Sequence, residues 1–151
     1  MLGLPADAEQ PLLIEADSGT YNDDPNGTLE LSGNVTLEQG TMRVEAAQVT
    51  ATKRDGELFR VVATGTDGEP AQFRLRRGPD EPFVRGHAQT VDYGISEQRA
   101  SLSGNAFLSA GVREYRGGTI VWDMKEDRVD CQAGCRYHET EPPPQPPPTP
   151  D

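Results

Sequence analysis

A stretch that occurs twice constrains the fold of this chain most strongly. Residues 29–37 read LELSGNVTL and return 71 residues later as ASLSGNAFL, at residues 100–108. In both copies apolar and polar residues alternate around a Gly-Asn pair, which is the period of a half-buried β-strand. Glycine accepts a positive φ and asparagine tolerates it, so the pair is suited to a bulge or a junction between strands. The pattern predicts that one β unit is used twice.

The same alternation continues through most of the chain. Its 16 glycines and 13 prolines favour many turns, and one of these, Asn26–Gly27, is typical of a type I′ hairpin. No segment keeps a helical period over about ten residues. Short strands at even spacing predict an all-β sandwich, jelly roll or open barrel. With only 34% hydrophobic residues, such strands are better suited to line a slot than to fill a thick core.

Composition divides the chain into three regions. Residues 1–10 are small, acidic and proline-bearing, which predicts a flexible lead-in. Residues 11–138 carry the alternating pattern in two halves, about 11–77 and 83–138, joined by the loop Gly-Pro-Asp-Glu-Pro. Residues 139–151 are rich in proline, which cannot donate to a β-ladder, so we expect a disordered tail of polyproline type.

Charge and motifs exclude several classes of function. The net charge of −11 opposes binding to a polyphosphate backbone, so nucleic acid is not an expected partner. The sequence lacks a nucleophile elbow, a phosphate-binding Gly-rich loop and a His-Glu-x-x-His motif. His87 has no carboxylate in a recognisable pairing, which favours a structural role. We therefore expect neither an enzyme nor a cofactor.

The two cysteines, Cys131 and Cys135, leave three alternatives open. In an extended strand, positions four apart are separated by roughly 13 Å, too far for a disulfide. Gly134 allows the chain to turn between them, which makes a local disulfide feasible. Free thiols remain an alternative, and so does a metal site completed by His138, although the spacing is not a standard zinc pattern.

Several short motifs, in order, resemble the OstA-like family of lipopolysaccharide-transport domains. They are QPLLIEAD at 10–17, the two Gly-Asn units, GTMRV at 40–44, EPAQF at 69–73 and the run 86–93 that begins GHA. Each motif is weak alone, but their order and spacing cover about residues 10–135. The cysteine pair and the proline-rich tail depart from the family pattern.

The resemblance implies a slightly twisted, open antiparallel β-jelly roll, V-shaped in section. It implies an apolar groove that holds the acyl chains of lipopolysaccharide while the domain carries the lipid across the periplasm, from the inner to the outer membrane. It also implies end strands that pair with LptC-like and LptD-like domains at the two membranes, or head to tail in a homo-oligomer. The alternatives are an LptC-type or LptD-type domain of the same pathway, or a polymerising structural β-module without a lipid ligand.

Matching positions give the residues that the resemblance implies at the groove. Leu12 and Ile14 would lie at its entrance, and Arg74, Arg76, Arg77 and Arg85 would face either solvent or the lipid head group. The wall would be formed by apolar side chains, each of which is equally suited to an ordinary core: Leu31, Val35, Val44, Phe73, Leu75, Tyr93, Ile95, Leu102, Leu108, Ile120 and Trp122.

Overall fold

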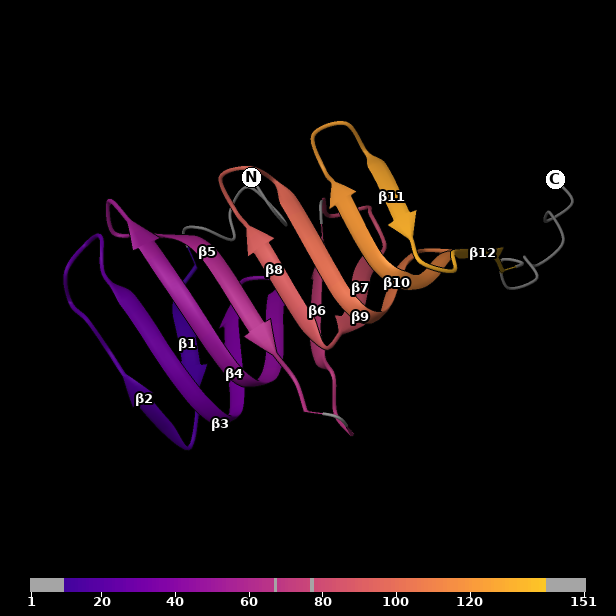
Figure 1. Ribbon diagram of the computed structural model, residues 1–151. Helices are drawn as coiled ribbons and strands as arrows, with labels where there is room; N and C mark the ends of the chain where they lie inside the picture. Colours follow the sequence, from indigo (N-terminus) through magenta and orange to yellow (C-terminus); the bar gives the residue numbers. More distant parts are fainter. Residues whose placement is uncertain (1–9, 67, 77, 141–151) are drawn as a thin grey trace, which may run out of the picture.

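The computed structural model describes residues 10–66, 68–76 and 78–140, which form twelve antiparallel strands (Figure 1). No helix in these ranges could cross a membrane. The twelve strands confirm the predicted all-β class. The lead-in at 1–9 and the tail at 141–151 lie outside the described residues. The strands are β1 (Leu12–Glu15), β2 (Ser18–Thr20), β3 (Thr28–Gln39), β4 (Met42–Arg54), β5 (Glu57–Thr64), β6 (Ala71–Arg76), β7 (Phe83–Ala88), β8 (Thr90–Gly94), β9 (Arg99–Ala110), β10 (Arg113–Asp123), β11 (Arg128–Gln132) and β12 (Arg136–Glu139).

The long strands β3, β4, β9 and β10 bend, and each contributes one part to each of two layers. The front sheet has the order β2-β3-β4-β5-β8-β9-β10-β11. The back sheet has the order β1-β3-β4-β6-β7-β9-β10-β12. The two layers meet along the bends, which gives a V-shaped section, and Figure 1 looks onto the front sheet with β1, β6 and β7 behind it. The roll therefore leaves strand edges at its two ends, β1 and β2 at one and β11 and β12 at the other.

The Gly-Asn pairs form the bends. Gly33 and Asn34 have φ values of 81° and 47°, and Gly104 and Asn105 have φ values of 85° and 49°. At each site two residues of one strand lie opposite a single residue of the next, which is a β-bulge. A bulge bends its strand and increases the local twist, so the repeated motif turns the strands from one sheet into the other.

Two local expectations differ from the structure. Neither Asn26 nor Gly27 has a positive φ, so the predicted type I′ turn is wrong. β2 is short and ends well before this pair, and Gly27 instead donates its N–H to the Asp24 carbonyl at 2.9 Å. At the other terminus, β12 runs to Glu139, and the N–H of Thr140 donates to the Val112 carbonyl at 2.7 Å. Sheet structure therefore continues past residue 138.

The inward faces of the two sheets form one continuous apolar core. Alternate residues of the long strands point into it, as the period of two requires. Leu31, Leu37, Leu102 and Leu108 are each no more than 3% exposed. Because the sheets have no covering helices among the described residues, this layer of side chains is the interior of the roll.

Candidate functional site

The space between the two sheets is the candidate site, and it contains nearly all of the residues predicted to line a groove. Ten of the thirteen are less than 5% exposed: Leu31, Val35, Val44, Phe73, Leu75, Tyr93, Leu102, Leu108, Ile120 and Trp122. Ile14 and Ile95 pack against the edge of this core, and Leu12 is 36% exposed. The structure thus brings the predicted wall together and places the predicted entrance at one rim.

The interior is closed by packing. A solvent-filled groove would expose its wall, yet Leu75, Leu102 and Ile120 are each 0% exposed. The rings of Phe73 in the back sheet and Tyr93 in the front sheet have centroids 6.5 Å apart and meet across the interior. The open groove expected along this wall is therefore not present in this conformation, because the apolar side chains of the two sheets fill the space between them.

The backbone links the two sheets at the bends. Asp17 donates its N–H to the Gly33 carbonyl at 2.8 Å, and Gln89 donates to the Gly104 carbonyl at 3.0 Å. The turn at 133–135 leads from β11 in the front sheet to β12 in the back sheet. Gly65 likewise donates to the Gln89 carbonyl at 2.8 Å, and Gly118 donates to the Ala133 carbonyl at 2.9 Å, so the segments that cross between the sheets are hydrogen-bonded near the bends. Away from the bends, side-chain packing holds the sheets together.

The rim at β1 and β2 is partly uncovered and apolar on its inner side. Leu12 and Ile14 point inward, since Ile14 lies opposite the buried Leu37 in the β1–β3 pairing. Leu13, on the outer face of the same strand, is 55% exposed. Tyr21, 58% exposed, contributes an aromatic side chain beside β2. At this rim the apolar core therefore borders on solvent.

The rim at β11 and β12 is aromatic. Tyr115 and Tyr137 are paired across β10 and β12, and their ring centroids lie 5.1 Å apart. Tyr137 is 53% exposed, and its pKa is raised by loss of solvent around the phenol and by the Glu139 carboxylate. Sequence reasoning missed Tyr137, since it lies between Arg136 and His138, where one apolar residue makes no alternating pattern.

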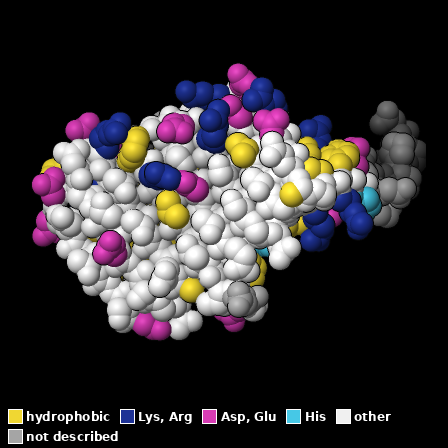
Figure 2. Space-filling model, in the orientation of Figure 1, with side chains coloured by type: hydrophobic (Ala, Val, Ile, Leu, Met, Phe, Trp, Pro, Cys, Tyr) yellow, Lys and Arg dark blue, Asp and Glu magenta, His cyan; other side chains and the backbone are white. Residues whose placement is uncertain are grey.

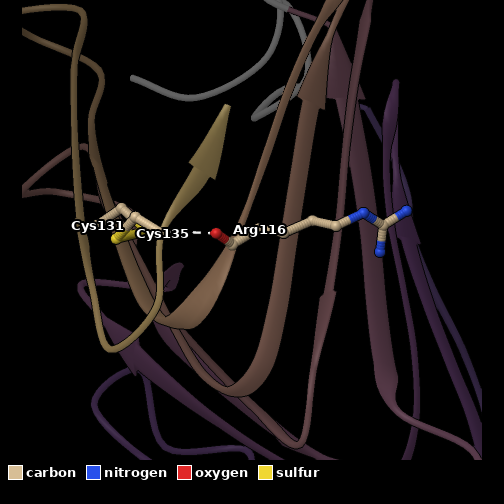
Figure 3. Close-up of a disulfide and its surroundings, with 3 residues drawn as sticks. All are labelled: Arg116, Cys131 and Cys135. Atoms are coloured by element: carbon tan, nitrogen blue, oxygen red, sulfur yellow. Dashed lines mark hydrogen bonds between the residues drawn. A yellow bond between two sulfur atoms is a disulfide. The ribbon is translucent and has the colours of Figure 1, made fainter. Parts of the chain in front are cut away.

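A disulfide joins Cys131, in β11, to Cys135, the residue immediately before β12 (Figure 3). The turn between them uses Ala133 and Gly134 with φ values of 66° and 82°. Cys131 Sγ also lies 3.5 Å from the carbonyl oxygen of Arg116. Because this sulfur is bonded to Cys135, it has no hydrogen to donate, and we treat this approach as a packing contact. The bridge holds the terminal strands of both sheets together.

The disulfide decides between the alternatives that were left open for the two cysteines. Within the described ranges, no group of three or more His, Cys, Asp or Glu side chains could hold a metal ion. His138 lies 3.7 Å from Glu114, away from the sulfur atoms now joined to each other. The space between the sheets is lined by buried apolar groups.

The sequence matches a known protein family and known relatives. Residues 13–128 match the family described as LptA/(LptD N-terminal domain) LPS transport protein. The lipopolysaccharide export system protein LptA of Escherichia coli K12 is 32% identical over 125 residues, covering 83% of this chain and 66% of that protein. The chain thus spans slightly less than two thirds of the length of that relative.

Two comparisons with Pseudomonas aeruginosa LptH agree. Its sequence is 27% identical over 145 residues, covering 95% of this chain and 81% of the relative. Its crystal structure superposes with a TM-score of 0.74 at 24% identity, covering 92% of this chain and 100% of that one. That protein is described as the LptA-homologous periplasmic component of the lipopolysaccharide transport device. That likeness establishes the fold. The sequence motifs most resemble LptA within the OstA-like domains, and the chain belongs to the LptA/LptD N-terminal domain family of lipopolysaccharide transport proteins.

Proposed function

We propose that this chain binds the acyl chains of lipopolysaccharide between its two sheets and carries the lipid across the periplasm as one segment of a β-jelly-roll bridge. The observation that carries the proposal is a continuous apolar interior, bounded by two sheets that the backbone joins along one side. The relatives are named as lipopolysaccharide export system proteins, and the proposed ligand follows from that name.

Opening of the V lets acyl chains enter a packed interior. Separation of the sheets exposes apolar side chains, and an acyl chain that takes their place buries its own surface, worth about 0.8 kcal/mol per CH₂ group. The bulges at Gly33 and Gly104 bend the strands without interrupting the sheets, so the angle between the layers can change there. Phosphates and sugars remain in water outside the V.

The strand edges support assembly into a bridge. β1 and β2 at one end, and β11 and β12 at the other, present backbone groups to which a further strand can add. Figure 2 shows acidic side chains along the β2–β3 end, and basic side chains beside the other end. We propose head-to-tail pairing with like domains, including LptC-like and LptD-like domains at the inner and outer membranes. Light scattering over a concentration series, with and without residues 141–151, tests this assembly.

Native mass spectrometry with lipopolysaccharide tests the ligand, and β1 provides a matched pair of variants. Ile14 points inward at the rim, and its neighbour Leu13 points outward. We expect Ile14→Gln to weaken lipid binding by about tenfold, because it removes a buried aliphatic contact. Leu13→Gln should bind as the unsubstituted protein does. Equal lipid binding by both folded variants would contradict the proposal and favour a structural module without a lipid ligand.

A further inference from the structure

Some arginines on the outer faces of the two sheets have a carboxylate partner, and others do not. Three arginines of the front sheet are paired: Arg60 with Asp92 at 2.8 Å, Arg99 with Asp123 at 3.3 Å, and Arg128 with Asp130 at 3.3 Å. Figure 2 shows such blue and magenta side chains side by side on this face. On the back sheet, Arg43 is paired with Glu38 and Glu45, whereas Arg74 and Arg85 have no ion pair with any described residue, in a chain of net charge −11. These arginines are therefore available to an external anion.

The unpaired arginines converge. The guanidinium carbons of Arg74, Arg76 and Arg85 lie 5.3, 4.9 and 5.6 Å from the centre of the Phe83 ring. Cation–π attraction favours each contact singly. Three like charges around one ring nevertheless repel one another. A bound anion would relieve this repulsion.

A cavity of about 290 Å³ opens beside these residues on the back sheet. Arg74 and Arg85 line it, and they lie opposite each other in the β6–β7 pairing. The Nε atom of Arg74 is buried and has no hydrogen-bond partner among the described residues. A buried donor that is left unsatisfied is costly unless an acceptor reaches it. Glu45 also lines the cavity, and Arg43 donates to it at 2.7 Å while it pairs with Glu38 as well, so one carboxylate of this group opposes an anion that the other arginines attract.

The far wall of the cavity is aromatic. His87 stacks on Phe107, its partner in the β7–β9 pairing, with ring centroids 5.0 Å apart and planes inclined by 18°. The guanidinium carbon of Arg116 lies over the Phe107 ring, 4.5 Å from its centre. The Arg116 side chain points away from the disulfide in Figure 3. Burial, and then the charge of Arg116, lower the pKa of His87, so the imidazole is neutral at pH 7. Flat rings beside guanidinium groups can pack against a sugar ring that carries an anionic substituent.

We propose that this cavity is a binding site for a phosphate monoester, held by Arg74 and Arg85, with its organic group against His87 and Phe107. Guanidinium groups offer paired N–H donors that match phosphate oxygens, and the buried Nε of Arg74 gains the acceptor it lacks. The site lies on the outer face of the back sheet. It is separate from the interior proposed for acyl chains and does not depend on that proposal.

NMR titration of the two histidines in the full chain tests the site, with glucose 1-phosphate, inorganic phosphate and glucose as separate probes. We expect glucose 1-phosphate to shift the His87 ring signals to saturation and to raise the pKa of His87, because a nearby anion favours the imidazolium. His138, which is exposed beside Glu114, serves as the internal control. Weaker binding of inorganic phosphate would assign part of the affinity to the aromatic wall, and equal binding would assign it to the phosphate alone.

Substitutions separate the site from general attraction of anions. Arg74→Gln and Arg85→Gln should each weaken binding of glucose 1-phosphate by about tenfold or more, because each removes a charge-assisted hydrogen bond. Arg60→Gln removes the same charge from the front sheet and should leave the affinity unchanged. Circular dichroism checks that each variant is folded. Absence of saturable His87 shifts, saturable binding of glucose, or equal weakening by Arg60→Gln would overturn the proposal.

Discussion

The two halves of the roll, β1–β6 and β7–β12, use the same order of strand pairing but end differently. In each half the first two strands pair with the third, and the fifth and sixth pair with the fourth. The first half joins its last two strands through residues 65–70, and the second through residues 133–135 beside a disulfide. Both halves share the bend, but the connection between their last two strands differs.

The fourth strand of each half shows how the sequence accommodates this difference. Ala46 and Ala47 in β4 correspond to Gly117 and Gly118 in β10, 71 residues later. A Cβ at Gly117 would lie 2.4 Å from Cys131 Sγ, and one at Gly118 would lie 2.6 Å from the Cβ of Ala133. The second half lacks these side chains because the disulfide and its turn occupy their space. The C-terminal edge therefore has a disulfide-linked turn packed closely against β10, which the first half lacks.

The largest effect should be the same in both halves. Leu37 and Leu108 are equivalent residues with exposures of 0% and 1%. Substitution of either by alanine should lower the free energy of unfolding by about 2–5 kcal/mol, since each leaves a cavity in the shared core. Urea unfolding measures this loss, with the exposed Leu13→Ala as the control. Similar losses support one shared core, whereas a loss at only one site would break the equivalence of the halves.

Removal of the disulfide should affect the second half alone. Cys131 and Cys135 are four residues apart, and closure of so short a loop is worth about 2 kcal/mol in the chain-entropy account. The double variant Cys131→Ala/Cys135→Ala should lose about this much stability, and hydrogen exchange should increase in β11 and β12 before β5 and β6. Addition of a reductant should not change the stability of this double variant further, because the variant has no disulfide to reduce. Unchanged exchange in β11 and β12 would show that the bridge does not fix this edge.

The bends should respond alike to loss of glycine. Gly33 and Gly104 have φ values of 81° and 85°, and an added Cβ would lie 2.5 Å from Asp17 Oδ2 or 2.7 Å from Gln89 Cβ. Gly33→Ala and Gly104→Ala should each cost about 1–2 kcal/mol because the left-handed conformation strains an L-residue. Gly68→Ala is the control, since a Cβ there meets nothing within 4 Å. A neutral result at one bend would mean that only the other one needs its glycine.

The smallest effect concerns an ion pair present in one half. Arg99 and Asp123 correspond to Thr28 and Thr52 in the first half. Hydrogen bonds from the backbone N–H of Glu126 and from Arg99 hold the pKa of Asp123 below its ordinary value of 3.8. The ionised form therefore stabilises the fold above that value, and the contribution is lost as the pH falls through the folded pKa.

Urea unfolding of Asp123→Asn at about pH 6 and about pH 3 tests this carboxylate. The variant should be less stable than the unsubstituted protein at the higher pH, and the difference should shrink at the lower one. Thr52→Asn, at the equivalent position, should show no such dependence on pH. A difference that persists in acid would assign the effect to the side chain's shape instead of its charge.

The sequence predicted the parts of the fold that depend on local chemistry. Alternation identified the long strands, and Gly-Asn identified the bends at Gly33 and Gly104. It did not show that each long strand belongs to two sheets, because inward and outward residues continue to alternate on both sides of a bulge. β12 was missed for a different reason. Its residues Arg136–Glu139 are all exposed, so register with β10 places them, and no apolar pattern marks them.

The candidate site was predicted in its residues but not in its conformation. Leu102 and Ile120 point inward, as their alternation requires, yet alternation is the same for a groove and for a closed core. Whether two apolar layers touch depends on the angle of the V, which no local pattern sets. The cavity beside Arg74 and His87 also depends on pairing between strands distant in sequence, so only the basic character of that stretch was visible.

Photo-crosslinking from the two faces of β8 tests the central claim most directly. Tyr93 points into the interior, and Thr90 on the same strand points outward. With a photoreactive phenylalanine at one position or the other, irradiation in the presence of lipopolysaccharide should give a lipid adduct at position 93 and none at position 90. Adducts of equal yield at both positions, or none from position 93 while the lipid remains bound, would contradict the account.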